Sequence, residues 1–132
     1  MKKLFLIILL FLTSAYAEVI NQYTNQALID SGIKIIDIRT IGEWKESGLV
    51  KNSIAIEFFN EKGEYNVPVF MEKLGQNIKQ GEKFALICQT GSRTRIVSQF
   101  LAKQFNMQVI NLRGGIVYAK AKGIKLYPYK AY

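Results

Sequence analysis

The chain has 132 residues, with 18 Lys and Arg against 10 Asp and Glu, one Cys and no His. This length predicts one domain with its own hydrophobic core. The absence of His excludes Ser-His-Asp and Cys-His catalysis within the chain, and a single Cys excludes an internal disulfide, a C-x-x-C pair and cysteine-rich zinc sites. Chemistry must therefore use the thiol, carboxylates, amines, guanidinium groups or the backbone.

The first 17 residues, MKKLFLIILLFLTSAYA, have the pattern of a secretory signal peptide. Two lysines precede an unbroken apolar run at 4–12, and the A-Y-A tripeptide at 15–17 matches an A-x-A cleavage site. The run is shorter than the ~20 apolar residues of a membrane-spanning helix. We therefore expect cleavage after Ala17 and a mature domain, 18–132, that is periplasmic or secreted and free of the membrane. The alternative is an uncleaved N-terminal anchor.

Loss of Lys2 and Lys3 would lower the formal net charge from +8 to +6, a mild positive balance that attracts anions. No basic stripe interleaved with aromatic residues is present, so we do not expect binding to nucleic acid. Exported proteins usually pair their cysteines. The lone Cys88 of this chain therefore invites a functional explanation.

Segments rich in β-branched residues alternate with segments of helical spacing. We predict strands at 18–21, 33–38, 54–59, 84–88 and 107–112, and helices at 25–30, 41–47, 68–78, 93–105 and 116–122. This alternation predicts an α/β domain, in which a mostly parallel sheet of about five strands carries helices on both faces. Thr24 is predicted to cap the first helix, and residues 120–132 to form a loosely packed end.

Ligands of such sheets bind beyond the carboxyl ends of the strands, and Cys88 stands at such an end, before a short loop and a helix. Backbone N–H groups of a tight strand-to-helix turn can converge on an anion, and the helix dipole adds positive potential there. Both effects stabilise a thiolate over a thiol. The position therefore predicts a nucleophilic sulfur. The alternative is a buried cysteine that acts as a small hydrophobic residue.

The residues after Cys88 suit an anion-binding loop. Gly91 permits a sharp turn, Thr90 or Ser92 can donate a hydroxyl hydrogen bond or cap the next helix, and Arg93 supplies a planar cation suited to oxyanions.

Three ordered motifs resemble those of single-domain rhodaneses. The run C-Q-T-G-S-R at 88–93 matches the C-x-x-G-x-R loop of that family, D-I-R at 37–39 with E-W at 43–44 resembles D-x-R…E-[FYW], and L-R-G-G at 112–115 resembles L-x-G-G. The resemblance covers nearly all of residues 18–126. The segment G-L-V-K-N-S at 48–53 departs from the family's G-H-I-P-G-A by lacking His and Pro, which bears on loop geometry more than on catalysis.

The resemblance implies a rhodanese-like fold and a thiosulfate sulfurtransferase. Cys88 would attack the sulfane sulfur of thiosulfate or a similar small sulfur-containing anion, release sulfite and form a Cys88 persulfide. A thiol or protein acceptor would then remove the outer sulfur of this persulfide. Cys88 and Arg93 would be catalytic. The donor and the persulfide would be bound by the loop residues Gln89, Thr90, Gly91, Ser92 and Arg93. No cofactor and no metal ion are expected.

Asp37 and Arg39 are expected to support this loop. Asp37 could accept hydrogen bonds from the loop or pair with Arg93, whereas a purely structural interpretation pairs Arg39 with Glu43. Other functions stay open: a non-enzymatic sulfur carrier or partner-binding module, a redox sensor that forms an intermolecular disulfide, and a cysteine phosphatase or arsenate reductase. The last class uses C-x5-R, which would require Arg where this chain has Thr94. The sequence leaves the physiological donor, the acceptor and the oligomeric state open.

Overall fold

The computed structural model describes residues 17–131. The predicted signal peptide therefore lies outside the described residues, except for Ala17. Within the described part of the chain, no helix is long and apolar enough to span a membrane.

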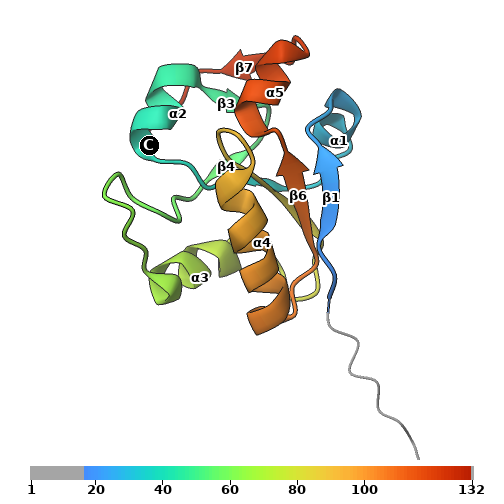
Figure 1. The fold of residues 1–132 in the computed structure, drawn as a ribbon, viewed down its shortest axis with the longest axis vertical. Coiled ribbons are helices and arrows are strands. Elements are labelled where there is room, and N and C mark those ends of the chain that lie inside the picture. The colour runs from blue at the N-terminus through green and yellow to red at the C-terminus, as the bar shows by residue number, and fades with distance from the viewer. Residues whose placement is uncertain (1–16, 132) are drawn as a thin grey trace, which may run out of the picture.

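A sheet of five parallel strands forms the centre of the fold, in the order β1-β6-β5-β2-β4 (Figure 1). The strands are β1 (Ile20–Tyr23), β2 (Ile35–Asp37), β4 (Ile54–Ala55), β5 (Phe84–Ile87) and β6 (Val109–Arg113). All four residues of β5 are buried, as expected for a continuous apolar strand in a sheet covered on both faces. The predicted α/β fold with a five-stranded parallel sheet is confirmed, although most strands are shorter than predicted.

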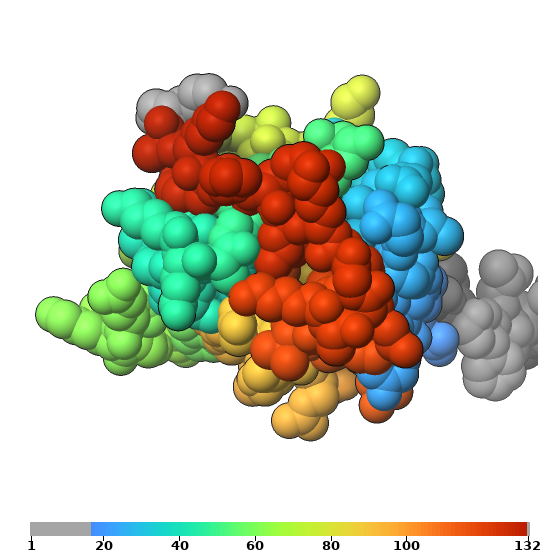
Figure 2. Space-filling model, turned by 90° about the horizontal axis from the view of Figure 1, so that it is seen from above, coloured from blue at the N-terminus to red at the C-terminus, as the bar shows by residue number. Residues whose placement is uncertain are grey.

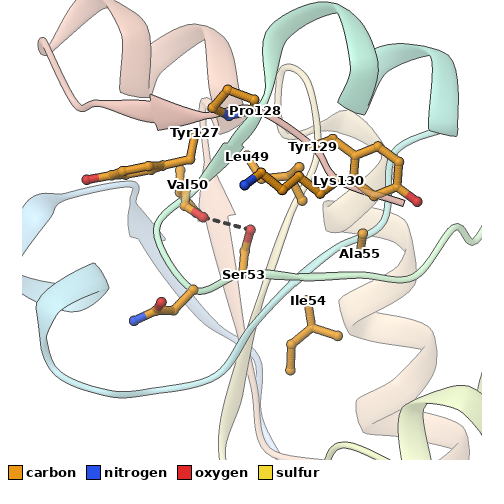
Figure 3. Close-up of a pocket in the computed structure, with 10 residues that line it drawn as sticks. Leu49, Val50, Ser53, Ile54, Ala55, Tyr127, Pro128, Tyr129 and Lys130 are labelled. Atoms are coloured by element: carbon orange, nitrogen blue, oxygen red, sulfur yellow. Dashed lines mark hydrogen bonds between the residues drawn. The ribbon is translucent and has the colours of Figure 1, made fainter. Parts of the chain in front are cut away.

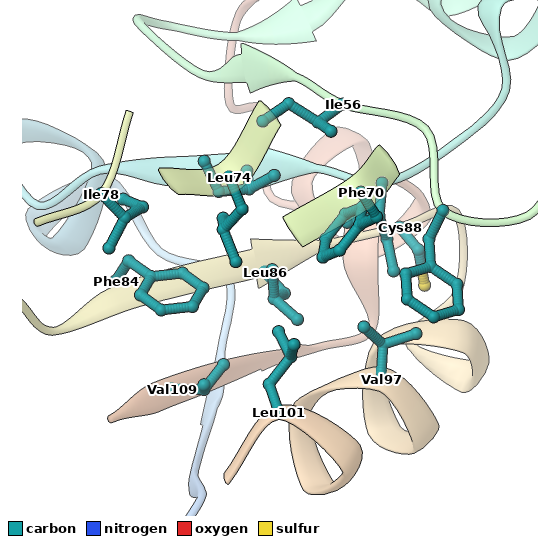
Figure 4. Packing of buried hydrophobic residues seen from close by; sticks show 13 residues of the cluster. Ile56, Phe70, Leu74, Ile78, Phe84, Leu86, Cys88, Val97, Leu101 and Val109 are labelled. Carbon is teal, nitrogen blue, oxygen red and sulfur yellow. The ribbon is translucent and has the colours of Figure 1, made fainter. Parts of the chain in front are cut away.

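Helices cover both faces of this sheet. On one face, α3 (Val67–Gly75) and α4 (Ser92–Phe105) pack over a cluster that includes Phe70, Leu86 and Leu101 (Figure 4). On the other, α1 (Gln26–Asp30) and α5 (Gly115–Ala121) cover a second cluster around Ile87 and Leu112. The predicted cap of α1 is wrong by one residue, because the Asn25 side chain accepts the Leu28 N–H at 2.9 Å.

The C-terminal segment is not a loose end. Its β7 (Leu126–Tyr127) pairs antiparallel with β3 (Leu49–Val50), a two-stranded sheet that the sequence analysis did not predict. Farther along, the Tyr129 ring packs on Trp44 of α2 (Ile41–Ser47), with 5.3 Å between ring centroids. Figure 2 shows this red segment beside the teal α2. Figure 3 shows the surface pocket of about 470 Å³ that the segment forms against β3 and β4.

Candidate active site

The predicted site residues gather where parallel strands end. Cys88 directly follows β5, and the neighbouring β2 ends at Asp37, whose register partner in β5 is Ile87. Cys88 is fully buried and belongs to the apolar cluster on the α3 and α4 face (Figure 4). The structure thus places the sulfur at the carboxyl edge of the sheet, as predicted, but under cover rather than open to solvent.

The loop after Cys88 is held in one orientation by the first turn of α5. The N–H groups of Ile116 and Val117 donate to the carbonyl oxygens of Cys88 and Gln89, at 2.9 and 3.0 Å. Every described peptide bond is trans, so the carbonyl of one residue and the N–H of the following residue point in opposite directions. The N–H groups of Gln89 and Thr90 therefore point away from the first turn of α5.

Two further groups contact the sulfur directly. The Gly91 N–H donates to Cys88 Sγ at 3.2 Å, and the thiol lies 3.7 Å from Thr94 Oγ1, which itself donates to the Gly91 carbonyl. Gly91 has φ +96° and is the N-cap of α4, so the first N–H groups of this helix have no acceptor within it. Of the two roles suggested for Thr90 and Ser92, neither side chain caps α4, but their hydroxyls form a hydrogen bond with one another at 3.3 Å.

Gly115→Ala should destabilise the protein and displace the Cys88 loop. A Cβ at this position would lie 2.3 Å from the Cys88 carbonyl oxygen, and φ is +56°. We expect the free energy of unfolding to fall by about 2–4 kcal/mol, from overpacking and backbone strain together. The measurement is urea denaturation. Gly63→Ala is the control, because φ is also positive there but no atom lies within 4 Å of the added Cβ. An equal loss in both variants would contradict the close approach of α5 to the loop.

A fully buried ion pair supports the loop from the other side. The Arg39 guanidinium donates to both carboxylate oxygens of Asp37, and Trp44 Nε1 donates to the same carboxylate at 3.1 Å. Arg39 also donates to the Gly48 carbonyl at 2.7 Å and to Gln89 Oε1 at 3.1 Å. Through Gln89 the pair reaches the Cys88 loop. The structure thus gives Asp37 and Arg39 the position expected of supporting residues, while their contribution to catalysis stays a prediction.

The structural pairing of Arg39 with Glu43 suggested by the sequence is wrong. Glu43 instead forms a bidentate ion pair with Arg93, with both N–O distances at 2.7 Å. Arg39 precedes Thr40, the N-cap of α2, and therefore lies outside the helix. Side chains four residues apart regularly contact one another only when both belong to the same helix, which is not the case for Arg39 and Glu43. Glu43 occupies the third position of the helix and also forms a capping box with Thr40.

The ion pair stabilises the charged form of both partners. Hydrogen bonds from Arg93 hold the pKa of Glu43 below its ordinary value of 4.5, against the opposing effect of partial burial. Hydrogen bonds to Glu43 likewise raise the pKa of Arg93, against the opposing effect of partial burial, and the negative charge of Glu43 acts in the same direction as these bonds. Arg93 is thus a permanent cation, and any anion that binds its guanidinium must compete with Glu43.

Glu43→Gln should lower the KM for thiosulfate about threefold. The substitution keeps an acceptor at the third helical position, so the capping box survives, while the carboxylate that competes with the dianion is removed. The measurement is steady-state sulfur transfer at several salt concentrations, because the effect should shrink as salt screens it. Glu46→Gln, an exposed change on the same helix, is the control. A raised KM would show instead that Glu43 positions Arg93 for the donor.

The same pair predicts a pH dependence of stability. A carboxyl group whose pKa is lowered on folding contributes stability that is present above its unfolded pKa and is lost as pH falls through the folded value. The difference in unfolding free energy between the native protein and Glu43→Gln should therefore be constant above about pH 4.5 and decrease below it. Urea titrations between pH 7 and pH 3 measure it. A difference that grows on acidification would contradict the direction of the shift.

Two residues of the site were not recognised from the sequence. Thr94 was noted only as a departure from C-x5-R, yet its hydroxyl lies between the sulfur and the loop backbone. The sequence places Glu43 in the E-W part of the second motif and suggests Arg39 as its partner, whereas the partner in the structure is Arg93. Within residues 17–131, no group of three or more His, Cys, Asp and Glu side chains is placed to hold a metal ion.

Comparisons with known proteins identify the family to which this domain belongs. A family model described as Rhodanese-like domain matches residues 21–122. Rhodanese-like domain-containing protein 17 of Arabidopsis thaliana is 27% identical over 105 residues, which cover 76% of this chain and 67% of that protein. A rhodanese-like domain protein from Staphylococcus aureus superposes with a TM-score of 0.58 at 19% identity, covering 83% of this chain and 98% of that one.

The fold likeness extends to a second solved structure, Rv0390 from M. tuberculosis. It has a TM-score of 0.58 and 21% identity, with coverage of 76% of this chain and 80% of that one. At these identities the solved structures show a shared fold alone. The family match, by contrast, spans the central sheet from β1 to α5, including the Cys88 loop. The chain belongs to the rhodanese-like domain family.

Proposed function

We propose that this protein is a sulfurtransferase that carries sulfane sulfur on Cys88. In the first half-reaction the Cys88 thiolate attacks the outer sulfur of thiosulfate. A new S–S bond forms, the S–S bond of thiosulfate breaks, and sulfite leaves with the bonding electron pair. The product is a Cys88 persulfide anion, so no net proton transfer is required. An acceptor thiol or a protein thiol then removes the outer sulfur, which completes a ping-pong scheme.

The orientation of the loop amides is the observation that carries this proposal. Because α5 holds the carbonyls of Cys88 and Gln89, the N–H groups of Gln89 and Thr90 point away from that helix, and the Gly91 N–H donates to Cys88 Sγ at 3.2 Å. Converging N–H groups at a helix N-terminus stabilise negative charge. They would stabilise the thiolate before transfer and the persulfide anion after it.

The loop supports a phosphatase function less well. A C-x5-R loop needs a guanidinium six residues after the cysteine, and that position is Thr94, whose hydroxyl is engaged with Sγ and the Gly91 carbonyl. The guanidinium of this loop, that of Arg93, comes one residue earlier and is bound to Glu43. Sulfur transfer needs a cradle for one sulfur atom rather than for a tetrahedral phosphoryl group.

Intact mass spectrometry tests the proposal. The reduced, purified protein is treated with thiosulfate, and we expect a gain of one sulfur atom that cyanide or dithiothreitol removes. Multiple turnovers with cyanide would establish the enzyme, whereas loading without turnover would favour a sulfur carrier. No gain from thiosulfate or from small persulfides, on a thiol that still reacts with iodoacetamide, would reject the proposal. Release of phosphate from p-nitrophenyl phosphate would favour the phosphatase alternative.

We further propose that the domain acts outside the cytoplasm. The basic residues, apolar run and A-x-A site at 1–17 support export, and the mature N-terminus is expected at Glu18. N-terminal sequencing of the protein from fractionated cells tests this. A mature chain that begins at residue 18 in the periplasmic or secreted fraction is the expected result, and retention of residue 1 in the cytoplasm would contradict it.

A further inference from the structure

A second pocket, of about 490 Å³, lies beside the Cys88 loop. It is formed by the carboxyl ends of β1 and β6, the first two turns of α4, and the loop itself through Thr90 and Gly91. Gly91 is also the residue whose N–H donates to Cys88 Sγ at 3.2 Å. One loop residue thus contacts both the sulfur and the pocket, whose volume lies in the range of small-molecule sites.

The charged groups in this pocket have one sign. Arg95 of α4 and Arg113 at the end of β6 both line it, and no Asp or Glu does. Neither arginine forms an ion pair with any residue in the described part of the chain. The Arg113 guanidinium lies over the Tyr23 ring, 5.1 Å from its centroid, which restricts the orientation of its donors. Two exposed arginines without a carboxylate partner give this pocket a positive charge that favours anions, and each guanidinium can bind one carboxylate.

A buried polar group in the pocket wall also points to a ligand. Asn111 lies in the middle of β6 and is only 2% exposed. Its Nδ2 donates to Asn21 Oδ1 at 2.9 Å, while its Oδ1 is buried without a hydrogen-bond partner among residues 17–131. Such a group is costly in a folded protein, and an aliphatic residue would avoid the cost. Because Oδ1 can only accept a hydrogen bond, it fits a donor group of a ligand, while the preference of the pocket for a carboxylate comes from the two arginines.

We propose that this pocket binds the carboxylate groups of a small thiol that accepts sulfur from Cys88. The inference rests on the proposed function. Arg95 and Arg113 bind the carboxylates, and the thiol arm extends past Gly91 to the persulfide. The acceptor thiol gives its proton to the outer sulfur of the Cys88 persulfide anion, and the resulting acceptor thiolate then attacks that sulfur. A new S–S bond forms on the acceptor, the S–S bond to Cys88 breaks, and Cys88 leaves as a thiolate. The acceptor leaves as a persulfide that keeps the proton, so atoms and charge balance.

Binding is tested first, without any sulfur chemistry. Isothermal titration calorimetry of succinate, a dicarboxylate without a thiol, is carried out on Cys88→Ser. We expect saturable binding that weakens about tenfold in the triple variant that adds Arg95→Gln and Arg113→Gln, as for two partly exposed charge-assisted contacts. Lys103→Gln, which removes an exposed cation from the last turn of the same helix, is the matched control and should change binding less than twofold. Absence of binding, or equal weakening in the control, would overturn the pocket.

Transfer is tested second, with two acceptors. The KM for mercaptosuccinate, a dicarboxylate thiol, is divided by the KM for 2-mercaptoethanol, a neutral thiol, and this ratio should rise about tenfold in Arg95→Gln/Arg113→Gln. An unchanged ratio in a protein that binds succinate would mean that a separate dicarboxylate occupies the pocket, and would overturn the acceptor assignment. Failure of Cys88 to load sulfur at all would reject the proposed function, while the calorimetry would still decide whether the pocket binds dicarboxylates.

Discussion

Cys88→Ser should abolish sulfur loading and lower any turnover by about three orders of magnitude or more. The described part of the chain has no second thiol, so no other side chain can form the persulfide. The serine hydroxyl is not ionised near neutral pH and lacks the neighbouring base that a serine nucleophile requires. The measurement is intact mass after thiosulfate treatment, together with cyanide-dependent turnover. We expect no added sulfur at any thiosulfate concentration at which the native protein is fully loaded.

A second substitution separates this chemistry from folding. Cys88 lies in the apolar cluster with Leu86 and Val97, so a hydroxyl there carries a desolvation cost of its own. Cys88→Ala keeps the site apolar and should also fail to load sulfur, with cooperative unfolding retained. Val97→Ala removes volume from the same cluster but leaves the thiol in place, and it should still load one sulfur. Sulfur retained on either Cys88 variant would contradict the mechanism.

Arg39→Ala should lower the free energy of unfolding by about 3–5 kcal/mol. Both members of the Asp37–Arg39 pair have fully buried side chains, and removal of the guanidinium leaves a carboxylate with Trp44 Nε1 and the Arg39 backbone N–H as donors. The carbonyl of Gly48 and the Gln89 side chain also lose a donor. Since domains are stable by only about 5–15 kcal/mol, this loss is a large fraction of the total. Urea denaturation at pH 7 measures it.

The double variant Asp37→Leu/Arg39→Met separates two causes of destabilisation: the loss of the ion pair itself and the burial of the Asp37 carboxylate without its partner. Because both charges are removed, this variant should be less destabilised than Arg39→Ala, despite carrying one more substitution. Lys34→Gln breaks the partly exposed pair with Glu82 and the contact of Lys34 Nζ with the Asn77 carbonyl, and it should destabilise the protein much less than Arg39→Ala. If Arg39→Ala were no more destabilising than Lys34→Gln, the buried network would not support the loop as described.

Local sequence patterns predicted strands well where the whole segment is buried by sheet pairing and by packing on both faces. The β-branched and apolar runs before Asp37 and before Cys88 became the two central strands, since only a sheet covered on both faces buries such residues continuously. The apolar run at 54–59, by contrast, forms a strand only at Ile54–Ala55. After it the N–H groups of Ile56 and Phe58 still donate to the carbonyl oxygens of Asp37 and Ile38, but the regular ladder ends and Phe58 and Phe59 pack into an aromatic cluster.

Pairings between distant residues were the least predictable part of the site. Glu43, the partner of Arg93, lies 50 residues earlier in the chain. The spacing of four residues between Arg39 and Glu43 suggested a pairing that the structure does not contain. The antiparallel pairing of β3 with β7 also joins residues that are far apart in the sequence, and it was not predicted. Strands of two residues carry almost no periodic signal, and their partner is selected by the folded surface on which they meet.

The sequence by itself determined the candidate nucleophile, the loop that surrounds it and the class of fold. One cysteine, no histidine and a C-x-x-G-x-R run between a buried strand and a helix specify these through local geometry, since the strand end and the helix N-terminus are consecutive in the chain. Only the tertiary structure decided which charges neutralise one another and which stay free. Glu43 is paired with Arg93, Asp37 with Arg39, and Arg95 and Arg113 have no acidic partner in the described chain. Charge pairing depends on distances between side chains, and the chain brings distant residues within reach only when the strands align their carboxyl ends at one edge.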